Sequence, residues 1–145
     1  KFEFKNFHPG GSLSIKLKTV NDLMITGKKI PFVSEKINMK NALKIITEKG
    51  LGVLIIRNNR NITKGILTDG DIKRLNQKFE NFQNLKIQSV MKKYPISVNC
   101  DMLANQALYL MNKKRITSLC VHKGNKINKT IGIVHIHNIL NANIS

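Results

Sequence analysis

The sequence predicts a mixed α/β (α+β) fold made of two copies of one small β-α-β-β-α unit. The blocks VNDLM and QSVM end at Met24 and Met91, an offset of 91 − 24 = 67 residues. GILTDGDI begins at Gly65 and GIVHIHNI at Gly132, again an offset of 132 − 65 = 67. Between them NALKII matches QALYLM at an offset of 106 − 41 = 65. Three blocks in the same order indicate a duplicated unit, whose copies are expected to pack with pseudo-twofold symmetry.

Each copy is expected to start with a short strand, around Phe32–Val33 in the first and Ile96–Val98 in the second. A helix follows, because apolar residues then recur every three or four positions. Asn38 and Asp101 stand where the N-caps of these helices are expected. The residues that carry the helical spacing are Met39, Ala42, Leu43 and Ile46, and then Leu103, Ala107, Leu110 and Met111.

Two apolar strands complete each sheet, and a final helix closes each copy. The turn signals NNRN and KGN separate the two strands of each pair. The final helices are expected to begin at Asp69–Asp71 and Ile136–Asn138. The expected strands are Val53–Arg57 with Ile62–Leu67, and Thr117–Val121 with Lys126–Val134.

The composition is that of a folded chain with a large excess of positive charge. Of the 145 residues 41% are hydrophobic, and the formal net charge is +17. Phosphate neutralisation makes such a chain a candidate for nucleic-acid binding. The lysines are scattered, however, without interleaved aromatic residues, and Lys, Asn and Ile are the residues that AT-rich codons supply. We therefore expect solvated lysine faces that help to attract an anionic ligand, and no nucleic acid as a partner.

Several other classes of protein are not expected from this sequence. No apolar run approaches the roughly 18 residues of a membrane span, and the leading KFEFKNFHPGG has no apolar signal core. Cys100 and Cys120 show neither metal-ligand spacing nor a disulfide framework. These features predict a cytoplasmic protein with no metal and no cofactor. Because the chain opens at Lys1 inside an apparent loop, we expect it to be the tail piece of a longer protein.

The loop after GIL in the first copy carries candidate ligand-binding residues. A helix N-terminus there offers free backbone N–H groups to a phosphate. The Thr68 hydroxyl could donate to that phosphate, Asp71 could accept from two ribose hydroxyls, and Arg74 lies close enough along the helix to reach the same anion. The alternative is that Thr68 or Asp69 caps the helix and Asp71 favours its first turn. The loop by itself favours capping, and its repetition favours paired binding clefts.

The second copy has different side chains at the matching positions. His135 replaces Thr68 and Asn138 replaces Asp71, while His137 lies two residues beyond His135. His135 and His137 could hold a metal ion only with ligands from elsewhere in the chain, and the sequence shows no further group of candidate ligands. An imidazole that contacts an anionic ligand is the favoured reading, since histidine titrates near physiological pH.

These residues resemble the CBS domain family. The pattern G-x-x-T-D-G-D at the end of a repeated β-α-β-β-α unit is similar to that of CBS pairs, which are sensory modules that bind nucleotides such as adenylates. The resemblance implies that Thr68 contacts a phosphate and Asp71 a ribose. Because Asn138 replaces the ribose-binding carboxylate, the second cleft departs from the family pattern.

A narrower resemblance is to bacterial arabinose 5-phosphate isomerases, which have a sugar-isomerase (SIS) domain before a CBS pair. It extends over essentially the whole chain, through FHPGGSL, GILTDGDIKR, SVMKKYPISV and GIVHIHNIL. The resemblance implies residues 1–18 as the tail and linker of an SIS domain, 19–84 as CBS repeat 1 and 85–145 as CBS repeat 2. His8 of HPGG then corresponds to a residue of the SIS active site, stranded and inactive in this chain.

The function implied is regulatory. The parent enzymes interconvert ribulose 5-phosphate and arabinose 5-phosphate for synthesis of the lipopolysaccharide sugar Kdo, and this chain alone is expected to be inactive. A nucleotide or nucleotide-sugar, either an adenylate or CMP-Kdo, would bind the pair and modulate its own SIS domain. The resemblance also implies a homodimer formed through CBS pairs. The alternatives are a structural oligomerisation module with vestigial clefts and, less favoured, a basic nucleic-acid-binding domain.

Overall fold

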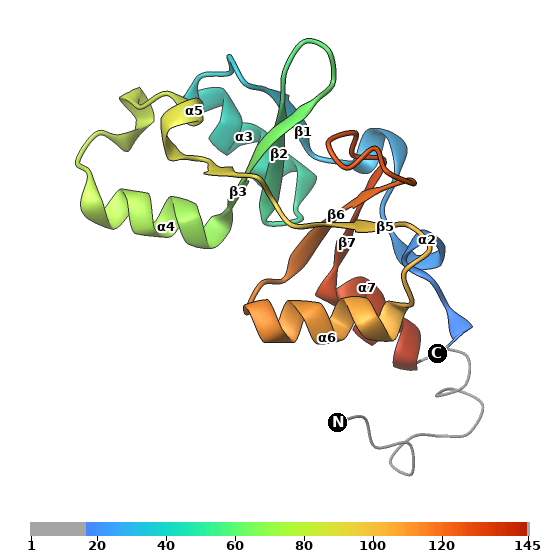
Figure 1. Cartoon of the computed structure of the whole chain (residues 1–145). Helices are drawn as coiled ribbons and strands as arrows, with labels where there is room; N and C mark the ends of the chain where they lie inside the picture. The colour runs from blue at the N-terminus through green and yellow to red at the C-terminus, as the bar shows by residue number, and fades with distance from the viewer. Residues whose placement is uncertain (1–16, 145) are drawn as a thin grey trace. The chain divides into compact units, whose positions relative to one another are not determined.

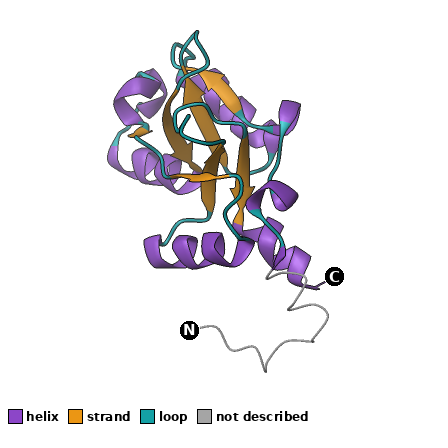
Figure 2. Ribbon diagram, turned by 45° about the vertical axis from the view of Figure 1, so that its right-hand side comes forward, coloured by secondary structure: helices purple, strands orange, loops and turns teal. Residues whose placement is uncertain are grey.

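A computed structural model describes residues 17–144, and the predicted α+β fold is confirmed (Figures 1 and 2). The chain divides into two compact units. Of the described residues, unit 1 comprises 17–26, 97–127 and 131–144, and unit 2 comprises 27–96 and 128–130. Each unit has one small sheet with helices packed along its strands.

Unit 2 contains a four-stranded sheet in the order β1-β2-β3-β4. β1 pairs with β2 in parallel, and the other two pairings are antiparallel. Its elements in chain order are η2 (Gly27–Lys29), β1 (Phe32–Ser34), α3 (Met39–Lys49), β2 (Val53–Arg57), β3 (Thr63–Thr68), α4 (Asp69–Lys78), η3 (Phe82–Asn84), α5 (Ile87–Val90) and β4 (Lys92–Lys93).

The core of unit 2 forms where the apolar stripe of α3 meets alternate residues of the sheet. Met39, Ala42 and Ile46 of α3 are buried against Leu54 and Ile56 of β2, which lie two residues apart and so share one sheet face. Asn38 accepts a hydrogen bond from the backbone N–H of Asn41 at 2.8 Å, which confirms the predicted N-cap. Gly50 ends α3 in the left-handed conformation (φ 70°), which a residue without a Cβ adopts most easily.

Unit 1 contains a three-stranded sheet in the order β5-β6-β7, with α6 and α7 packed against each other beside it (Figure 1). Alternate residues Leu119 and Val121 of β6 face Ala107 and Met111 of α6 in the core. Its elements are α2 (Val20–Leu23), β5 (Ser97–Asn99), α6 (Ala104–Lys114), β6 (Ser118–His122), β7 (Gly132–His135) and α7 (Ile136–Ile144).

Two local predictions for unit 1 are wrong. Asp101 does not cap α6, which begins at Ala104, because the Lys18 carbonyl accepts the free Ala104 N–H at 2.9 Å and so makes a side-chain cap unnecessary there. The strand expected over Lys126–Val134 is only Gly132–His135. Residues 128–130 belong instead to unit 2, where the Asn128 carbonyl accepts from the Thr63 N–H at 2.9 Å.

The leading segment of each sequence repeat packs in the unit formed by the other repeat. Ile25, in the leading segment of repeat 1, forms an antiparallel bridge with Ile133 of β7, with backbone hydrogen bonds of 2.8 and 3.0 Å. Lys92, ahead of β5, pairs with Ile66 of β3. Both pairs keep the repeat offset, since 92 − 25 = 67 and 133 − 66 = 67.

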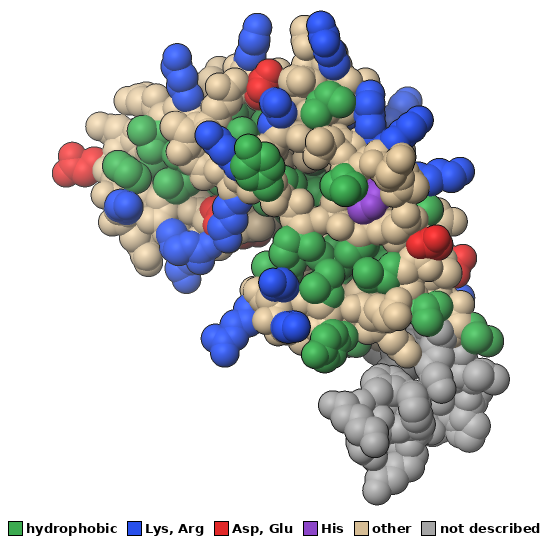
Figure 3. All heavy atoms as spheres, viewed as in Figure 1, with side chains coloured by type: hydrophobic (Ala, Val, Ile, Leu, Met, Phe, Trp, Pro, Cys, Tyr) green, Lys and Arg blue, Asp and Glu red, His purple; other side chains and the backbone are tan. Residues whose placement is uncertain are grey.

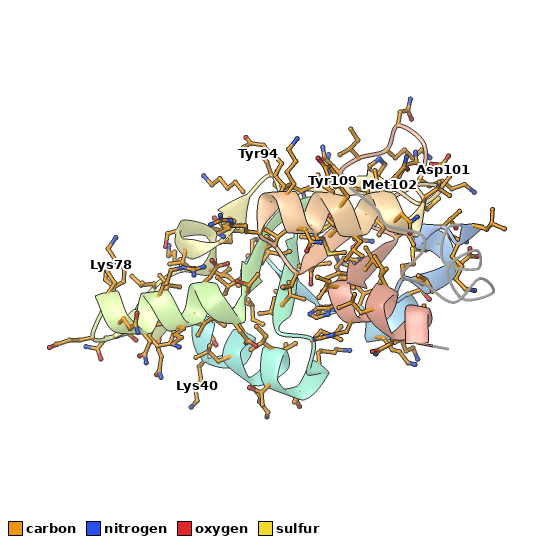
Figure 4. All side chains as sticks on the ribbon, turned by 90° about the horizontal axis from the view of Figure 1, so that it is seen from below. Lys40, Lys78, Tyr94, Asp101, Met102 and Tyr109 are labelled. Carbon is orange, nitrogen blue, oxygen red and sulfur yellow. The ribbon has the colours of Figure 1, made fainter. Side chains whose placement is uncertain are left out.

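The basic side chains are spread over the surface, as Figure 3 shows for one face. Lys40 on α3 and Lys78 at the end of α4 point away from the helices that carry them (Figure 4). Within residues 17–144, no helix is both long and apolar enough to cross a bilayer.

Candidate functional site

The candidate site of unit 2 lies where β3 ends and α4 begins. Thr68 is the N-cap, and its Oγ1 accepts from the Asp71 N–H at 3.1 Å. In return the Thr68 N–H donates to Asp71 Oδ2 at 3.0 Å. Two N–H groups that the helix leaves free are thus satisfied by a reciprocal capping box. The predicted capping role is confirmed for Thr68, whereas Asp69 is not the cap.

Two cations converge on the other carboxylate oxygen of this box. Arg74 Nη2 donates to Asp71 Oδ1 at 2.7 Å, and Lys92 Nζ lies 3.3 Å from the same atom. The Asp71 side chain is only 8% exposed, while those of Arg74 and Lys92 are 66% and 61% exposed. The carboxylate is therefore held inside the protein surface, and the cationic groups remain in contact with solvent.

Lys92 was missed by sequence reasoning because it lies 21 residues beyond Asp71. β4 brings it back: the pairs Gly65↔Lys93 and Ile66↔Lys92 place this two-residue strand beside β3. The approach is close, since a Cβ on Gly65 would lie 2.6 Å from Met91 Sδ and 2.9 Å from the Lys92 carbonyl oxygen. The repeated Met24 and Met91, and the repeated Gly-Ile at 65–66 and 132–133, are the sequence signal for this pairing, although they do not say which copies pair.

The balance of effects on Asp71 favours its charged form. Burial raises the pKa of this carboxyl, but the hydrogen bonds from the Thr68 backbone, Arg74 and the Thr68 side chain, together with the Lys92 charge, outweigh it. The net pKa lies below its usual value. At neutral pH the site therefore has one carboxylate facing two cations.

The matching loop of unit 1 has one of the two hydrogen bonds of the capping box and lacks the charged side chains. Asn138 Oδ1 accepts from the His135 N–H at 2.7 Å, as Asp71 does from Thr68. His135 Nδ1 accepts from the His137 N–H at 3.1 Å, and the two rings stack with centroids 4.9 Å apart. Burial, and then the charge of His137, lower the pKa of His135. At neutral pH the His135 imidazole is uncharged.

The structure thus brings the predicted site residues into two groups, one within each unit. Thr68, Asp71 and Arg74 form one connected cluster in unit 2, and the two histidines with Asn138 form another in unit 1. His8 lies outside the described residues. Within residues 17–144 no three His, Cys, Asp or Glu side chains are grouped so as to hold a metal ion.

Comparison with a family model gives two matches along the chain. Residues 20–78 and 87–145 each match the model described as CBS domain. The matched segments repeat the order found in the sequence, so the predicted resemblance to a CBS pair is confirmed.

Curated relatives align with the chain along almost its whole length. The chain is 39% identical over 143 residues to arabinose 5-phosphate isomerase KdsD of Yersinia pestis, and 37% identical to KdsD of Escherichia coli. In both cases 98% of the chain aligns with only 43% of the relative. The chain therefore spans less than half the length of these isomerases.

Solved structures with the same fold share little sequence. CBSX2 in complex with AMP is 21% identical, with a TM-score of 0.76 over 87% of this chain and 96% of that one. The CBS pair of MJ0100, in complex with 5′-methylthioadenosine and S-adenosyl-L-methionine, is 20% identical, with a TM-score of 0.76 over 86% and 94%. The CBS domain of a bacterial CNNM/CorC family Mg²⁺ transporter in complex with ATP is 13% identical, with a TM-score of 0.77 over 98% of both chains.

Proposed function

The chain belongs to the CBS domain family, as a tandem pair, and from this premise we propose that it is a ligand-sensing regulatory module. Its ligand is a nucleotide or a nucleotide-activated sugar. The binding residues are Thr68, Asp71 and Arg74 in unit 2, with His135, His137 and Asn138 at the matching loop of unit 1.

The observation that carries this proposal is the cluster around Asp71. A carboxylate held at the start of α4 can accept from the two hydroxyls of a ribose, while the Thr68 hydroxyl and the exposed Arg74 guanidinium suit a phosphate. The solved CBS structures named above contain AMP, ATP, 5′-methylthioadenosine and S-adenosyl-L-methionine, which share a ribose attached to a base. A carboxylate placed as Asp71 is suits the ribose that such ligands have in common.

The protein that this module serves is an arabinose 5-phosphate isomerase with an SIS domain. The support is the 39% identity to KdsD over 98% of the chain. A product of such a pathway is a natural regulator, so CMP-Kdo stands beside adenylates as a candidate ligand. The chain of residues 1–145 does not interconvert ribulose 5-phosphate and arabinose 5-phosphate; turnover by the purified chain contradicts this.

A ligand screen by thermal shift and calorimetry tests the proposal. AMP, ATP, CMP and CMP-Kdo are titrated into the wild-type chain, and at least one is expected to raise the melting temperature in proportion to its saturation. Asp71→Asn should weaken that ligand about tenfold or more, since it removes charge-assisted hydrogen bonds. Uniformly unchanged melting curves contradict the proposal.

The chain offers a matched control for the Asp71 variant. Asp22 closes a similar capping box, in which its Oδ2 accepts from the Thr19 N–H at 2.9 Å. Among the described residues no Arg or Lys forms an ion pair with Asp22. Asp22→Asn therefore alters a cap of the same kind without altering the candidate site, and ligand affinity should stay at the wild-type value.

The rival function is a structural oligomerisation module with vestigial clefts. It is favoured by the fact that Thr68 and Asp71 already satisfy each other in the capping box, without a ligand. It predicts unchanged melting curves together with a stable oligomer.

Either function includes a homodimer, for which the helices of unit 1 offer apolar surface. Tyr109 on α6 is 65% exposed and Leu140 on α7 is 40% exposed. Tyr109 points away from its helix in Figure 4. We expect Tyr109→Lys to shift the chain from dimer toward monomer in sedimentation analysis. The control Lys40→Ala on α3 should leave the proportion of dimer unchanged.

A further inference from the structure

Lys92 lies beside the candidate site without a part in the family pattern that defines it. It starts β4, which pairs with β3, the strand that leads directly into Thr68. Its Nζ is 3.3 Å from Asp71 Oδ1. The contact is made across 21 residues of sequence, so β4 and not local helix geometry positions this ammonium group.

The charge around Asp71 is unbalanced. Within residues 17–144 the two ion pairs of the structure, from Arg74 and from Lys92, both end on the same oxygen of Asp71. One carboxylate therefore faces two cations, and one positive charge is left without a counterion. A phosphate group brings the negative charge that this arrangement lacks.

The Lys92 ammonium is also free to change partner. Its side chain is 61% exposed, and its distance to Asp71 Oδ1 is longer than the 2.7 Å of the Arg74 contact. Because solvent surrounds the ammonium end of this ion pair, Lys92 adds little to folding stability through it. Moving the Lys92 ammonium from Asp71 to an incoming phosphate therefore costs little folding stability. Arg74 continues to hold the Asp71 carboxylate.

Unit 1 has no equivalent of this group. At the repeat offset of 67, Lys92 corresponds to Ile25 and Arg74 to Asn141, just as Asp71 corresponds to Asn138. Ile25 occupies the same place in the fold, because it bridges to Ile133 as Lys92 pairs with Ile66. The matching loop therefore has the strand pairing without the charges.

We propose that Lys92 is a phosphate-binding residue that makes unit 2, and not unit 1, selective for phosphorylated ligands. This inference rests on the proposed function and deepens it, since it names the part of the ligand that one further side chain recognises. Thr68 and Lys92 then offer one hydroxyl and one cation to the phosphate, while Arg74 keeps Asp71 in place for the ribose.

Calorimetry with AMP, ATP and adenosine tests the role of Lys92. Lys92→Ala should weaken AMP and ATP about tenfold, because it removes a charge-assisted contact, and should leave adenosine unchanged. Lys92→Arg should retain most of the affinity for AMP. The control is Lys93→Ala: Lys93 is the neighbouring exposed lysine on β4, where successive side chains point to opposite faces, so its loss should not change the affinity for AMP.

The outcomes separate the two proposals. If the wild-type chain binds AMP and Lys92→Ala binds it no more weakly than Lys93→Ala does, the role of Lys92 is wrong and the proposed function stands. Equal losses for AMP and adenosine also contradict a phosphate contact. If the wild-type chain binds none of AMP, ATP, CMP and CMP-Kdo, the proposed function fails and the role of Lys92 fails with it.

Discussion

Replacing Gly65 by alanine tests whether the close approach of β4 to β3 holds the candidate site together. The added Cβ would lie 2.6 Å from Met91 Sδ and 2.9 Å from the Lys92 carbonyl oxygen. Both distances are shorter than 3.0 Å, the closest approach normally found for a Cβ atom. The Met91 side chain can turn away. The Lys92 carbonyl belongs to the backbone of β4, so the strand itself has to move.

The expected loss follows from this overlap. Overpacking of this kind lowers the free energy of unfolding by about 1–3 kcal/mol. For a chain of this size that corresponds to a fall in melting temperature of about 2–12 °C. Because displacement of β4 carries Lys92 away from Asp71, the pKa of Asp71 should also rise toward its usual value.

Thermal unfolding followed by circular dichroism measures the first effect, and a carboxyl carbon NMR titration of Asp71 measures the second. Gly70→Ala is the control, since its Cβ would lie 3.4 Å from the flexible head of Arg74 and Gly70 is inside α4. That variant should match or slightly exceed wild-type stability. A Gly65→Ala chain that melts at the wild-type temperature, and whose Asp71 pKa stays as low as in the wild type, refutes the reasoning.

Three further predictions concern stability. Thr68→Ala removes the N-cap of α4 and should lower the free energy of unfolding by about 1 kcal/mol in denaturant titration, with Thr47→Ala on α3 as a smaller-effect control. Ser97→Ala leaves the buried His122 Nδ1 without its 2.6 Å partner and should lower stability by about 1–3 kcal/mol; a value within error of zero contradicts the contact. Acidification should remove stability in two stages. The His135 pKa is lowered in the folded chain, so stability from the neutral imidazole is present above the unfolded pKa of about 6.5 and declines below it. The Asp71 pKa is also lowered, so its contribution is present above about pH 4 and is lost as the pH falls through the folded value. Melting curves of His135→Ala and Asp71→Asn against pH should each lack one stage.

Local sequence signals predicted those elements whose stability comes from neighbouring residues. The strand Val53–Arg57 has the predicted bounds, because a run of β-branched and apolar residues between turn signals has few alternatives. The caps at Asn38 and Thr68 are confirmed, since both bonds reach only three residues along the chain. The predicted cap at Asp101 is wrong for the opposite reason. The free N–H at the start of α6 donates to the Lys18 carbonyl, more than 80 residues away in the chain.

The candidate site likewise has a part that local sequence predicts and a part that depends on long-range pairing. The hydroxyl, carboxylate and guanidinium of Thr68, Asp71 and Arg74 lie on the N-cap and the first two turns of α4, so their spacing along the chain brought them together. Lys92 reaches them only through the β3–β4 pairing, which no local pattern encodes. The lowered pKa of Asp71 comes from the hydrogen bonds of Thr68 and Arg74, and from the distant Lys92 charge, outweighing burial; residue type alone did not predict this balance.

By itself the sequence determined that one β-α-β-β-α unit occurs twice, that its loop after β3 carries the candidate binding residues, and that the second copy has lost their charges. Only the tertiary structure decided which leading segment pairs with which sheet. Ile25 and Lys92 stand at matching positions of the two copies, and each pairs at the same register with a strand of the other copy. The exchange of these segments, which places Lys92 at the charged loop and Ile25 at the uncharged one, depends on long-range strand pairing and not on local preference.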